Sequence, residues 1–283
     1  MAKRLIVNAD DFGYTSGINR AVIECAQRGV LTSATLMACA DASSEAAQLA
    51  RQHRLATGCH VILVDGEPLL SDLPTLAPQG RFRASIYEIA RDASLRRIAE
   101  EEVEREAYAQ ILRVQEAGVA LTHVDTHKHA HMFPRILRPL LRAAKQAGIR
   151  RVRSPFEPAW SLSLPHRLTS KHRTRTLQTR ALSTLHKRFL SAVKGAGFCA
   201  PDGALGVITT GTLDVQLLCH MLERIPEGTW ELVCHPGYHD EELASQNTRL
   251  LHSRDIEREA LTSPVVQEMV RRCGIQLISF ADL

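Results

Sequence analysis

Short apolar runs alternate along the chain with longer stretches in which apolar residues recur every three or four positions. Runs of this length are typical of buried strands, and the longer spacing is typical of amphipathic helices. The first half of the chain has expected strands at 5–9, 33–38, 57–64 and 120–125. The expected helices of the same half cover 18–28, 43–50, 95–118 and 135–147.

The second half continues the alternation less regularly. Expected strands lie at 149–153, 205–209, 231–234 and 275–280, with helices near 212–224 and 263–273. Strands that alternate with helices favour a parallel sheet with right-handed crossovers. Seven or eight such units predict an α/β fold, a single-domain and distorted TIM-like (β/α) barrel, over an open sheet. A G-x-G-x-x-G motif does not follow the first strand, which argues against a dinucleotide-binding fold.

Two segments interrupt this pattern. Residues 66–83 are rich in Pro and Gly and predict a long loop over one end of the fold, where such loops often cover active sites. Residues 160–200 predict a basic helical insertion, and the sequence between Glu157 and Asp202 contains no acidic residue. Its apolar stripe favours a core-facing helix with a solvated basic face. The alternative is peripheral contact with an anionic membrane.

Composition describes an ordinary globular protein. The 283 residues are 45% hydrophobic and 23% charged, with a mild net charge of +4, and nucleic acid is not an expected partner. The apolar runs are shorter than the roughly 18 residues of a membrane-spanning helix. The N-terminus has only a three-residue apolar run, Leu5 to Val7, so a cytoplasmic location is expected. Seven scattered cysteines without a C-x-x-C motif predict reduced thiols.

Two adjacent carboxylates, Asp10 and Asp11, come at the end of the first expected strand. Like charges this close ionise together only where a cation or a hydrogen-bond network compensates them. The alternative is ordinary turn chemistry, in which Asn8 or Asp11 bonds the backbone. Taken alone, the stretch fits both interpretations equally well.

Other polar clusters occur at the ends of other strands. His60 lies in the third strand, Asp125 to His131 follow the fourth, and His235 follows the strand at 231–234. In parallel α/β folds the active site lies at the carboxyl ends of the strands. We therefore expect these clusters to converge there, together with the two aspartates.

One carboxylate and two imidazoles form a ligand set for zinc or another divalent ion with open positions. Such an ion lowers the pKa of bound water and polarises a carbonyl group. A second carboxylate can then accept a proton while a histidine protonates the leaving group. Neighbouring strand residues point in different directions, so Asp10 and Asp11 can take separate roles. Spacing does not decide which of His127, His129 and His131 is the ligand.

The motifs resemble, in order, those of the YdjC-like carbohydrate deacetylases. The resemblance runs from residue 4 to about residue 282. It rests on Asn8-Ala9-Asp10-Asp11-Phe12-Gly13, Gly58-Cys59-His60-Val61, Asp65-Gly66-Glu67-Pro68, His123 to His131, Arg151 to Glu157, Cys234-His235-Pro236-Gly237-Tyr238 and Ser253 to Glu257.

This resemblance implies a distorted (β/α) barrel that removes acetyl groups from N-acetylated sugars. It implies that Asp11, His60 and His127 bind one divalent metal ion, Mg²⁺ or Zn²⁺. Asp10 would be the general base and His235 the general acid. Arg153, His131 and Asp125 would contact the substrate.

The stretch Val64 to Pro68, with Gly80 to Arg83 downstream, also resembles the branch associated with hopanoid biosynthesis. That resemblance implies an N-acetylglucosaminyl lipid as substrate, beside the alternative of a free oligosaccharide. Two rival functions keep the same barrel: a metal-dependent phosphoesterase or cyclic-amide hydrolase, and a non-catalytic sugar- or lipid-binding protein. A homodimer is compatible with the sequence.

Overall fold

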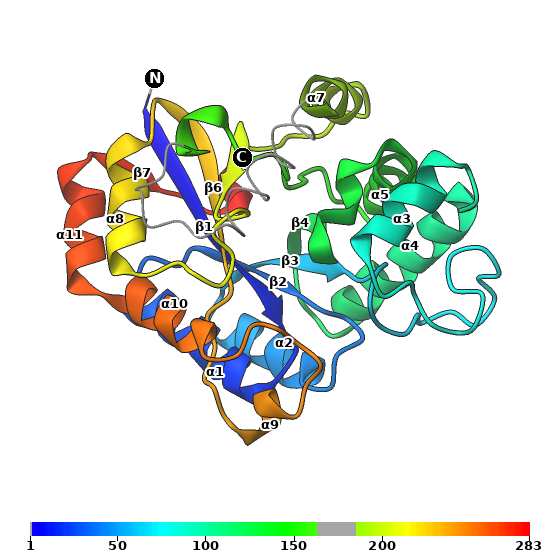
Figure 1. Ribbon diagram of the computed structural model, residues 1–283, viewed down its shortest axis with the longest axis horizontal. Coiled ribbons are helices and arrows are strands. Elements are labelled where there is room, and N and C mark those ends of the chain that lie inside the picture. Colours follow the sequence, from blue (N-terminus) through cyan, green and yellow to red (C-terminus); the bar gives the residue numbers. More distant parts are fainter. Residues whose placement is uncertain (1, 163–184) are drawn as a thin grey trace.

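A curled parallel sheet forms the centre of the molecule (Figure 1). The computed structural model describes residues 2–162 and 185–283. The strands are β1 (Lys3–Phe12), β2 (Ser33–Leu36), β3 (Ala56–Val61), β4 (Leu121–Thr126), β5 (Gly203–Leu205), β6 (Gly228–Cys234) and β7 (Ile275–Leu277). Their order is β4-β3-β2-β1-β6-β5, and β7 pairs with the first residues of β1.

The two ends of this sheet approach each other through irregular backbone. Parallel bridges join Val124 to Val152 and Arg151 to Cys199, just before β5. The amide of Ala204 in β5 donates to the carbonyl of Phe156 at 3.0 Å. These contacts connect β4 to β5 and confirm the predicted distorted TIM-like barrel of parallel strands. The strand expected at 149–153 is reduced to the bridges.

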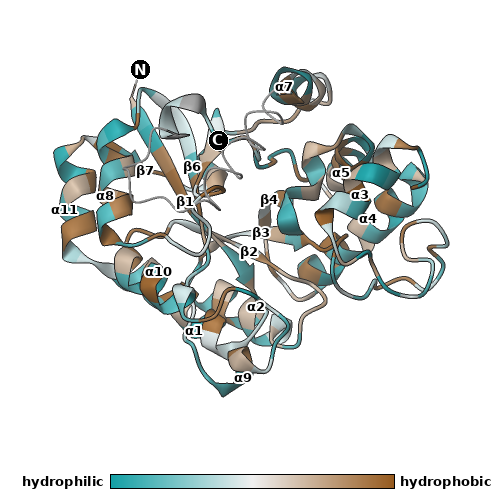
Figure 2. Ribbon diagram, viewed as in Figure 1, coloured by the Kyte–Doolittle hydropathy of each residue, from teal (hydrophilic) through white to brown (hydrophobic). Residues whose placement is uncertain are grey.

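Helices cover the outside of the curled sheet, and their hydrophobic residues turn towards it (Figure 2). The α-helices are α1 (Ser16–Arg28), α2 (Ser43–Gln52), α3 (Ile86–Ser94), α4 (Glu100–Glu116), α5 (Pro134–Gln146), α7 (His186–Gly195), α8 (Val215–Arg224), α9 (Glu241–Ala244), α10 (Ser253–Thr262) and α11 (Pro264–Arg272). The 3₁₀ helices are η1 (His127–Met132), η2 (Ala159–Leu162) and η4 (Phe280–Asp282).

The helix predicted at 95–118 corresponds to α4, which is shorter than predicted, and the separate helix α3 precedes it. Ser85 accepts from the amide of Tyr87 at 3.2 Å, and Glu88 accepts from the amide of Ser85 at 3.2 Å. This reciprocal capping fixes the start of α3. The Ser-x-x-Glu pattern was therefore present in the sequence as a signal for the missed helix.

Helix α4 holds the loop at 66–83 in place. Glu106 accepts from the amides of Leu69 and Leu70 at 2.9 and 3.0 Å. One turn earlier, Glu102 accepts from the amides of Thr75 and Leu76, both at 2.9 Å. Both glutamates are buried although they belong to a polar helix stripe. The loop is thus ordered by carboxylates that satisfy its backbone donors.

The predicted basic insertion falls largely on residues 163–184, which lie outside the described residues. Helix α7 belongs to its described part. Phe189 and Val193 on this helix are buried, while Lys187, Arg188 and Lys194 are exposed. The core-facing stripe is therefore confirmed where it is described. Across the described ranges, none of the helices combines the length and the apolar character needed to cross a membrane.

Gly58 in β3 has no room for a side chain, because an added Cβ would lie 2.5 Å from Cε1 of His123. That imidazole is buried and stacked on Phe280 with ring centroids 3.6 Å apart. We expect Gly58→Ala to lower the free energy of unfolding by about 1–3 kcal/mol through overpacking. Urea unfolding followed by circular dichroism measures the change.

Gly195→Ala is the matched control, since an added Cβ there would meet no atom within 4 Å. It should change stability by less than about 1 kcal/mol. Equal stability of both variants would contradict the steric argument.

Candidate active site

The two aspartates at the end of β1 lie on an irregular turn of the strand. The register with β2 shifts between Ala9 and Phe12, and Asp11 has a φ of 63°. The carboxylate of Asp10 pairs with Arg153, and that of Asp11 pairs with Arg254. The two side chains thus have different partners, and each negative charge has its own guanidinium.

Asp10 is held rigidly in an ionised state. Arg153 donates to both of its carboxylate oxygens, at 2.8 and 2.6 Å, and Thr35 donates to Oδ1 at 3.1 Å. Burial raises the pKa of Asp10, but the charge of Arg153 outweighs it and holds this pKa far below its ordinary value of 3.8. Asp10 is therefore a carboxylate of low basicity.

Arg153 is the centre of a buried charge cluster that joins three strands. Besides Asp10 in β1, its guanidinium contacts Asp125 in β4 at 2.5 Å and Glu231 in β6 at 2.7 Å. Its side chain has no exposed surface. Burial raises the pKa of Glu231 to about 7, against the opposing effect of Arg153. One guanidinium thus contacts three acidic groups, and its single charge offsets part of their negative charge.

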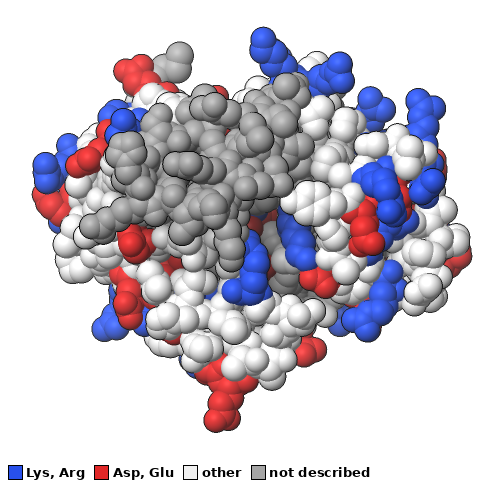
Figure 3. Space-filling model, viewed as in Figure 1, with Lys and Arg blue, Asp and Glu red and all other residues white. Residues whose placement is uncertain are grey.

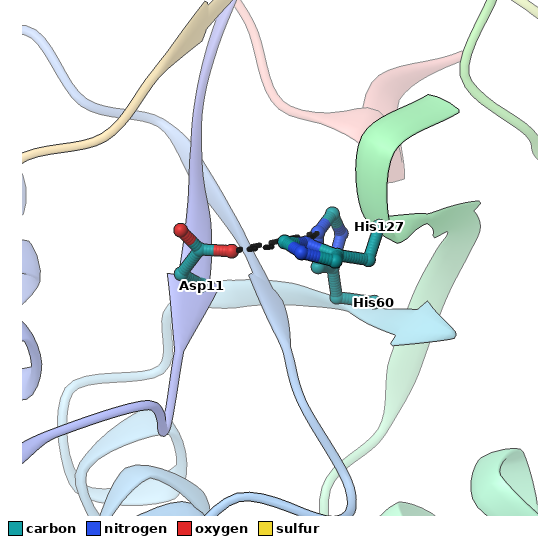
Figure 4. Close-up of side chains that lie close together, drawn as sticks. All are labelled: Asp11, His60 and His127. Carbon is teal, nitrogen blue, oxygen red and sulfur yellow. Dashed lines mark hydrogen bonds and ion pairs between the residues drawn. The ribbon is translucent and has the colours of Figure 1, made fainter. Parts of the chain in front are cut away.

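Asp11, His60 and His127 come together from β1, β3 and the start of η1 (Figure 4). Oδ1 of Asp11 lies 3.7 Å from Nε2 of His60 and 3.5 Å from Nδ1 of His127. The two imidazole nitrogens are 3.3 Å apart. This Oδ1 is buried without a hydrogen-bond partner among the described residues. Three convergent donor atoms, one of which is an unsatisfied carboxylate oxygen, fit a small divalent cation.

The orientation of His60 suits the same role. Its Nδ1 bonds Asp125 at 2.7 Å across the β3–β4 register, which directs Nε2 towards Asp11. A carboxylate behind an imidazole in this way fixes a metal ligand and strengthens it. Burial lowers the pKa of His60, but Asp125 and Asp10 outweigh burial and raise it to about 9. The site thus attracts positive charge.

A second set of donor atoms, from Asp10, His60 and Asp125, is also close enough to surround an ion. Arg153 already occupies both of its carboxylates. A cation there would face the guanidinium at short range, so the set with Asp11 and His127 fits a metal better.

The other two histidines of the block have different surroundings. His131 uses Nδ1 for Thr126 at 2.7 Å and Nε2 for the carbonyl of Arg153 at 3.2 Å. Burial lowers the pKa of His129 to about 3, and its Nδ1 has no partner among the described residues. Of the three histidines, the fold brings His127 to Asp11 and His60.

The three residues predicted to contact the substrate lie behind the site. Arg153, His131 and Asp125 are completely buried, and none of them lines the cavity in front of Asp10. Their contacts hold Asp10 and His60 in place. We interpret them as positioning residues, and direct contact with a substrate remains a prediction without geometric support.

His235 follows β6 and faces the cavity from the side opposite His127 along the sheet order. Burial lowers its pKa to about 4, although Asp10 and Asp11 oppose this shift. Its backbone amide donates to Glu257 at 2.6 Å. The imidazole is therefore neutral near pH 7, and its protonated form is a stronger acid than an ordinary imidazolium.

A cavity of about 1300 Å³ opens in front of these groups. The predicted residues Asp10, Asp11, His60, His127 and His235 all line it. Apolar side chains form parts of its wall, among them Ile62, Leu69, Ile86, Phe133 and Leu250. Arginine and lysine side chains also contribute, and such side chains border the hollowed centre of the face in Figure 3. The cavity accommodates a ligand with both polar and apolar parts.

Sequence reasoning missed Arg254, which lines the cavity and pairs with Asp11. It also missed Glu257, which accepts from the amide of His235. Both lie on α10, one helical turn apart, within the tail motif quoted from the sequence. A buried polar face on that helix was the available signal, but nothing local connects residue 254 to residue 11.

The chain is similar to known proteins over most or all of its length. The family model described as YdjC-like protein matches residues 4–272. A carbohydrate deacetylase of Geobacillus stearothermophilus is 34% identical over 286 residues, covering 100% of this chain and 98% of the relative. A chitooligosaccharide deacetylase of Serratia marcescens is 32% identical over 293 residues, covering 100% of both chains.

Solved structures agree on the fold. A candidate cellobiose-phosphate cleavage protein from Enterococcus faecalis has a TM-score of 0.76 at 27% identity, covering 100% of this chain and 99% of that one. A lactam utilization protein from Thermus thermophilus has a TM-score of 0.52 at 15% identity, covering 98% of this chain and 99% of that one. The second likeness concerns the fold alone.

Removal of the buried guanidinium of Arg153 is expected to lower the stability of the protein strongly. Arg153→Met leaves three carboxyl groups buried without their cation, and we expect a loss of about 3–5 kcal/mol in the free energy of unfolding at neutral pH. Arg142→Met is the control, because Arg142 pairs with Glu104 at the surface and should cost less than about 1 kcal/mol. Urea unfolding measures both.

The difference in stability between the wild type and Arg153→Met should depend on pH. The depressed pKa of Asp10 stabilises the wild type above pH 3.8, and this contribution is lost as the pH falls below that value. In Arg153→Met the buried carboxyls have raised pKa values, so the folded variant gains protons and relative stability as the pH falls from about 8 to about 5. A deficit that stays constant over this range would contradict the charge argument.

Proposed function

This chain belongs to the YdjC-like protein family, and on that premise we propose that it is a carbohydrate deacetylase, a hydrolase that removes the acetyl group from an N-acetylated sugar. The observation that carries the proposal is the convergence of Asp11, His60 and His127 beside Asp10 and His235 in one large cavity. Full-length similarity to proteins named as deacetylases supports it.

Asp11, His60 and His127 are the residues that would hold one divalent ion. When bound, such an ion supplies Lewis acidity, which polarises a carbonyl group and makes a water molecule acidic enough to deprotonate near neutral pH. Two imidazoles favour Zn²⁺, and a single carboxylate with open positions also suits Mg²⁺.

Asp10 is the proposed general base. It lines the cavity beside Asp11, and Arg153 keeps it ionised and immobile. Its low basicity means that it accepts a proton only from a strongly acidified water. Arg153 and Asp125 therefore act through Asp10 and His60 by orienting them.

His235 is the proposed general acid for the departing nitrogen. Burial lowers the pKa of His235 to about 4, so this imidazole is neutral in the free protein near pH 7 and has to take up a proton during the reaction. A proton that it takes up passes readily to the nitrogen of the tetrahedral adduct, which is more basic than an amide nitrogen. Glu257 fixes the backbone at this point through the amide of His235. Asp10 and His235 thus provide the two proton transfers of amide hydrolysis.

The finer proposal concerns the substrate, an N-acetylglucosamine-type oligosaccharide or glycolipid. A cavity of about 1300 Å³ exceeds the usual range of roughly 300–1,000 Å³ for small-ligand pockets, so more than one sugar unit fits. The apolar part of the cavity wall suits a sugar that carries an apolar aglycone. An N-acetylglucosaminyl hopanoid is such a substrate, with a large apolar group. We also retain a single domain with an insertion at about 160–200 as a prediction.

Acetate release tests the proposed activity and the substrate together. We expect release from chitooligosaccharides or from a lipid-linked N-acetylglucosamine, and loss of release after treatment with a chelator. A chromogenic phosphoester and a cyclic amide are assayed beside them. Turnover of either in place of acetate release would replace the proposal by one of its rivals, and binding of sugars without any turnover would favour a non-catalytic protein.

Two substitutions separate the base from the metal ligands. Asp10→Asn should lower kcat at least about 100-fold while metal content stays near that of the wild type, because general-base catalysis contributes roughly 10²–10⁴-fold. His60→Ala should lose the metal as well as the activity. Metal content by mass spectrometry of the purified protein and acetate release are the two measurements.

His53→Ala is the matched control, since His53 is exposed and does not line the cavity. It should retain both metal and activity. Near-normal turnover of Asp10→Asn would show that the base is another residue.

A further inference from the structure

Arg254 presents one unused hydrogen-bond donor beside the proposed metal ligands. Its Nη2 donates to Oδ2 of Asp11 at 2.6 Å, and its Nε donates to the carbonyl of Leu250 at 3.1 Å. Its Nη1 is buried and has no hydrogen-bond partner among the described residues. The side chain is 1% exposed, yet the residue lines the cavity.

The packing around the side chain keeps this donor in a fixed position. A Cβ added to Gly237 would lie 2.9 Å from Cδ of Arg254 and 3.0 Å from Cγ1 of Ile18. The amide of Gly237 also donates to the carbonyl of Arg254 at 3.2 Å. The turn after His235 therefore fits closely against the stem of this arginine. A guanidinium anchored in this way needs no rearrangement when a ligand arrives.

The free donor of Arg254 is unlike the donors of Arg153. Arg153 faces three carboxylates, is completely buried and does not line the cavity. Arg254 faces one carboxylate, and its remaining donor is on a residue of the cavity wall. A buried charged donor without an acceptor costs free energy, which an oxygen atom of a bound ligand would recover.

The position relative to Asp11 identifies which oxygen this is. One oxygen of Asp11 bonds Arg254, and the other faces His60 and His127. The guanidinium and the two imidazoles therefore face the two oxygens of one carboxylate, and all three side chains belong to residues of the same cavity wall. We propose that Arg254 is a catalytic residue, which donates from Nη1 to the acetyl oxygen while Nη2 holds Asp11. This inference rests on the proposed deacetylase function.

The role follows the movement of charge in the reaction. When water oxygen bonds to the acetyl carbon, the C=O π electrons move to the acetyl oxygen, and the guanidinium offsets that negative charge. The water proton passes to Asp10. When the C–N bond breaks, the electrons on the acetyl oxygen re-form the C=O bond, and the C–N electron pair leaves with the nitrogen, which takes a proton from His235. The acetic acid so formed still carries the second proton of water, and loss of this proton to the amine or to solvent gives acetate. Acetate beside Nη1 is then retained by a charge-assisted hydrogen bond.

The test separates donation to the substrate from support of Asp11. In Arg254→Met and Arg254→Lys, we expect kcat to fall by roughly 10²–10³-fold for Met and less for Lys, the range seen when an oxyanion donor is removed. KM should change little, and inhibition by acetate should weaken at least about tenfold, a factor set by the loss of one charged hydrogen bond. Zn²⁺ affinity, measured by calorimetry, should not weaken, because Asp11 keeps its charge.

Arg258→Met is the matched control. Arg258 lies one turn further along α10, stacks over the ring of Tyr238 at 4.6 Å and does not line the cavity. Its substitution should leave kcat and acetate inhibition unchanged. Addition of guanidinium chloride at millimolar concentration should restore part of the activity of Arg254→Ala and none of the activity of Asp10→Asn.

Three results would overturn the inference. These are unchanged turnover in both Arg254 variants, loss of Zn²⁺ affinity in parallel with turnover, or normal acetate inhibition in Arg254→Met. If the variants do not fold, a crystal structure of the wild type with acetate decides: acetate about 3 Å from Nη1 supports the inference, and acetate elsewhere overturns it. A wild type that releases no acetate from any N-acetylated sugar would instead refute the proposed function.

Discussion

Two neighbouring carboxylates, Asp10 and Asp11, end in the interior of the molecule, and the surrounding structure depends on how their charges are compensated. Each carboxylate has its own buried arginine, at 2.6 Å in both cases. Buried like charges without such partners would protonate or destabilise the fold. The bulge at Asp11 turns the two side chains to different partners, which makes separate compensation feasible.

The two arginines organise different parts of the protein. Arg153 ties β1, β4 and β6 together through their acidic residues, so contacts among these strands and the ionisation of Asp10 depend on one side chain. Arg254 brings the start of α10 to the same point and leaves a donor at the cavity. Stability and chemistry therefore share the same ion pairs, and a change in either arginine affects both.

The sequence predicted the parallel α/β barrel because strand-length apolar runs alternate with helical stretches. It also predicted that Asp10, Asp11, His60, His127 and His235 meet, because parallel strands present their carboxyl ends at one edge. It did not predict that α4 buries Glu102 and Glu106 under the 66–83 loop, since a polar helix stripe normally faces solvent. It placed Arg153, Asp125 and His131 near the site, but it did not distinguish residues that contact the substrate from residues that hold Asp10 and His60 in position.

Local pattern and spacing determined the elements, their parallel arrangement and the residue types that reach the site. Tertiary structure decided what each residue does there. His127 rather than His131 faces Asp11, because His131 uses both ring nitrogens for Thr126 and the backbone of Arg153. Arg254 meets Asp11 across 243 positions of chain. Such pairings arise from packing between distant segments, and the periodicity of neighbouring residues carries no information about them.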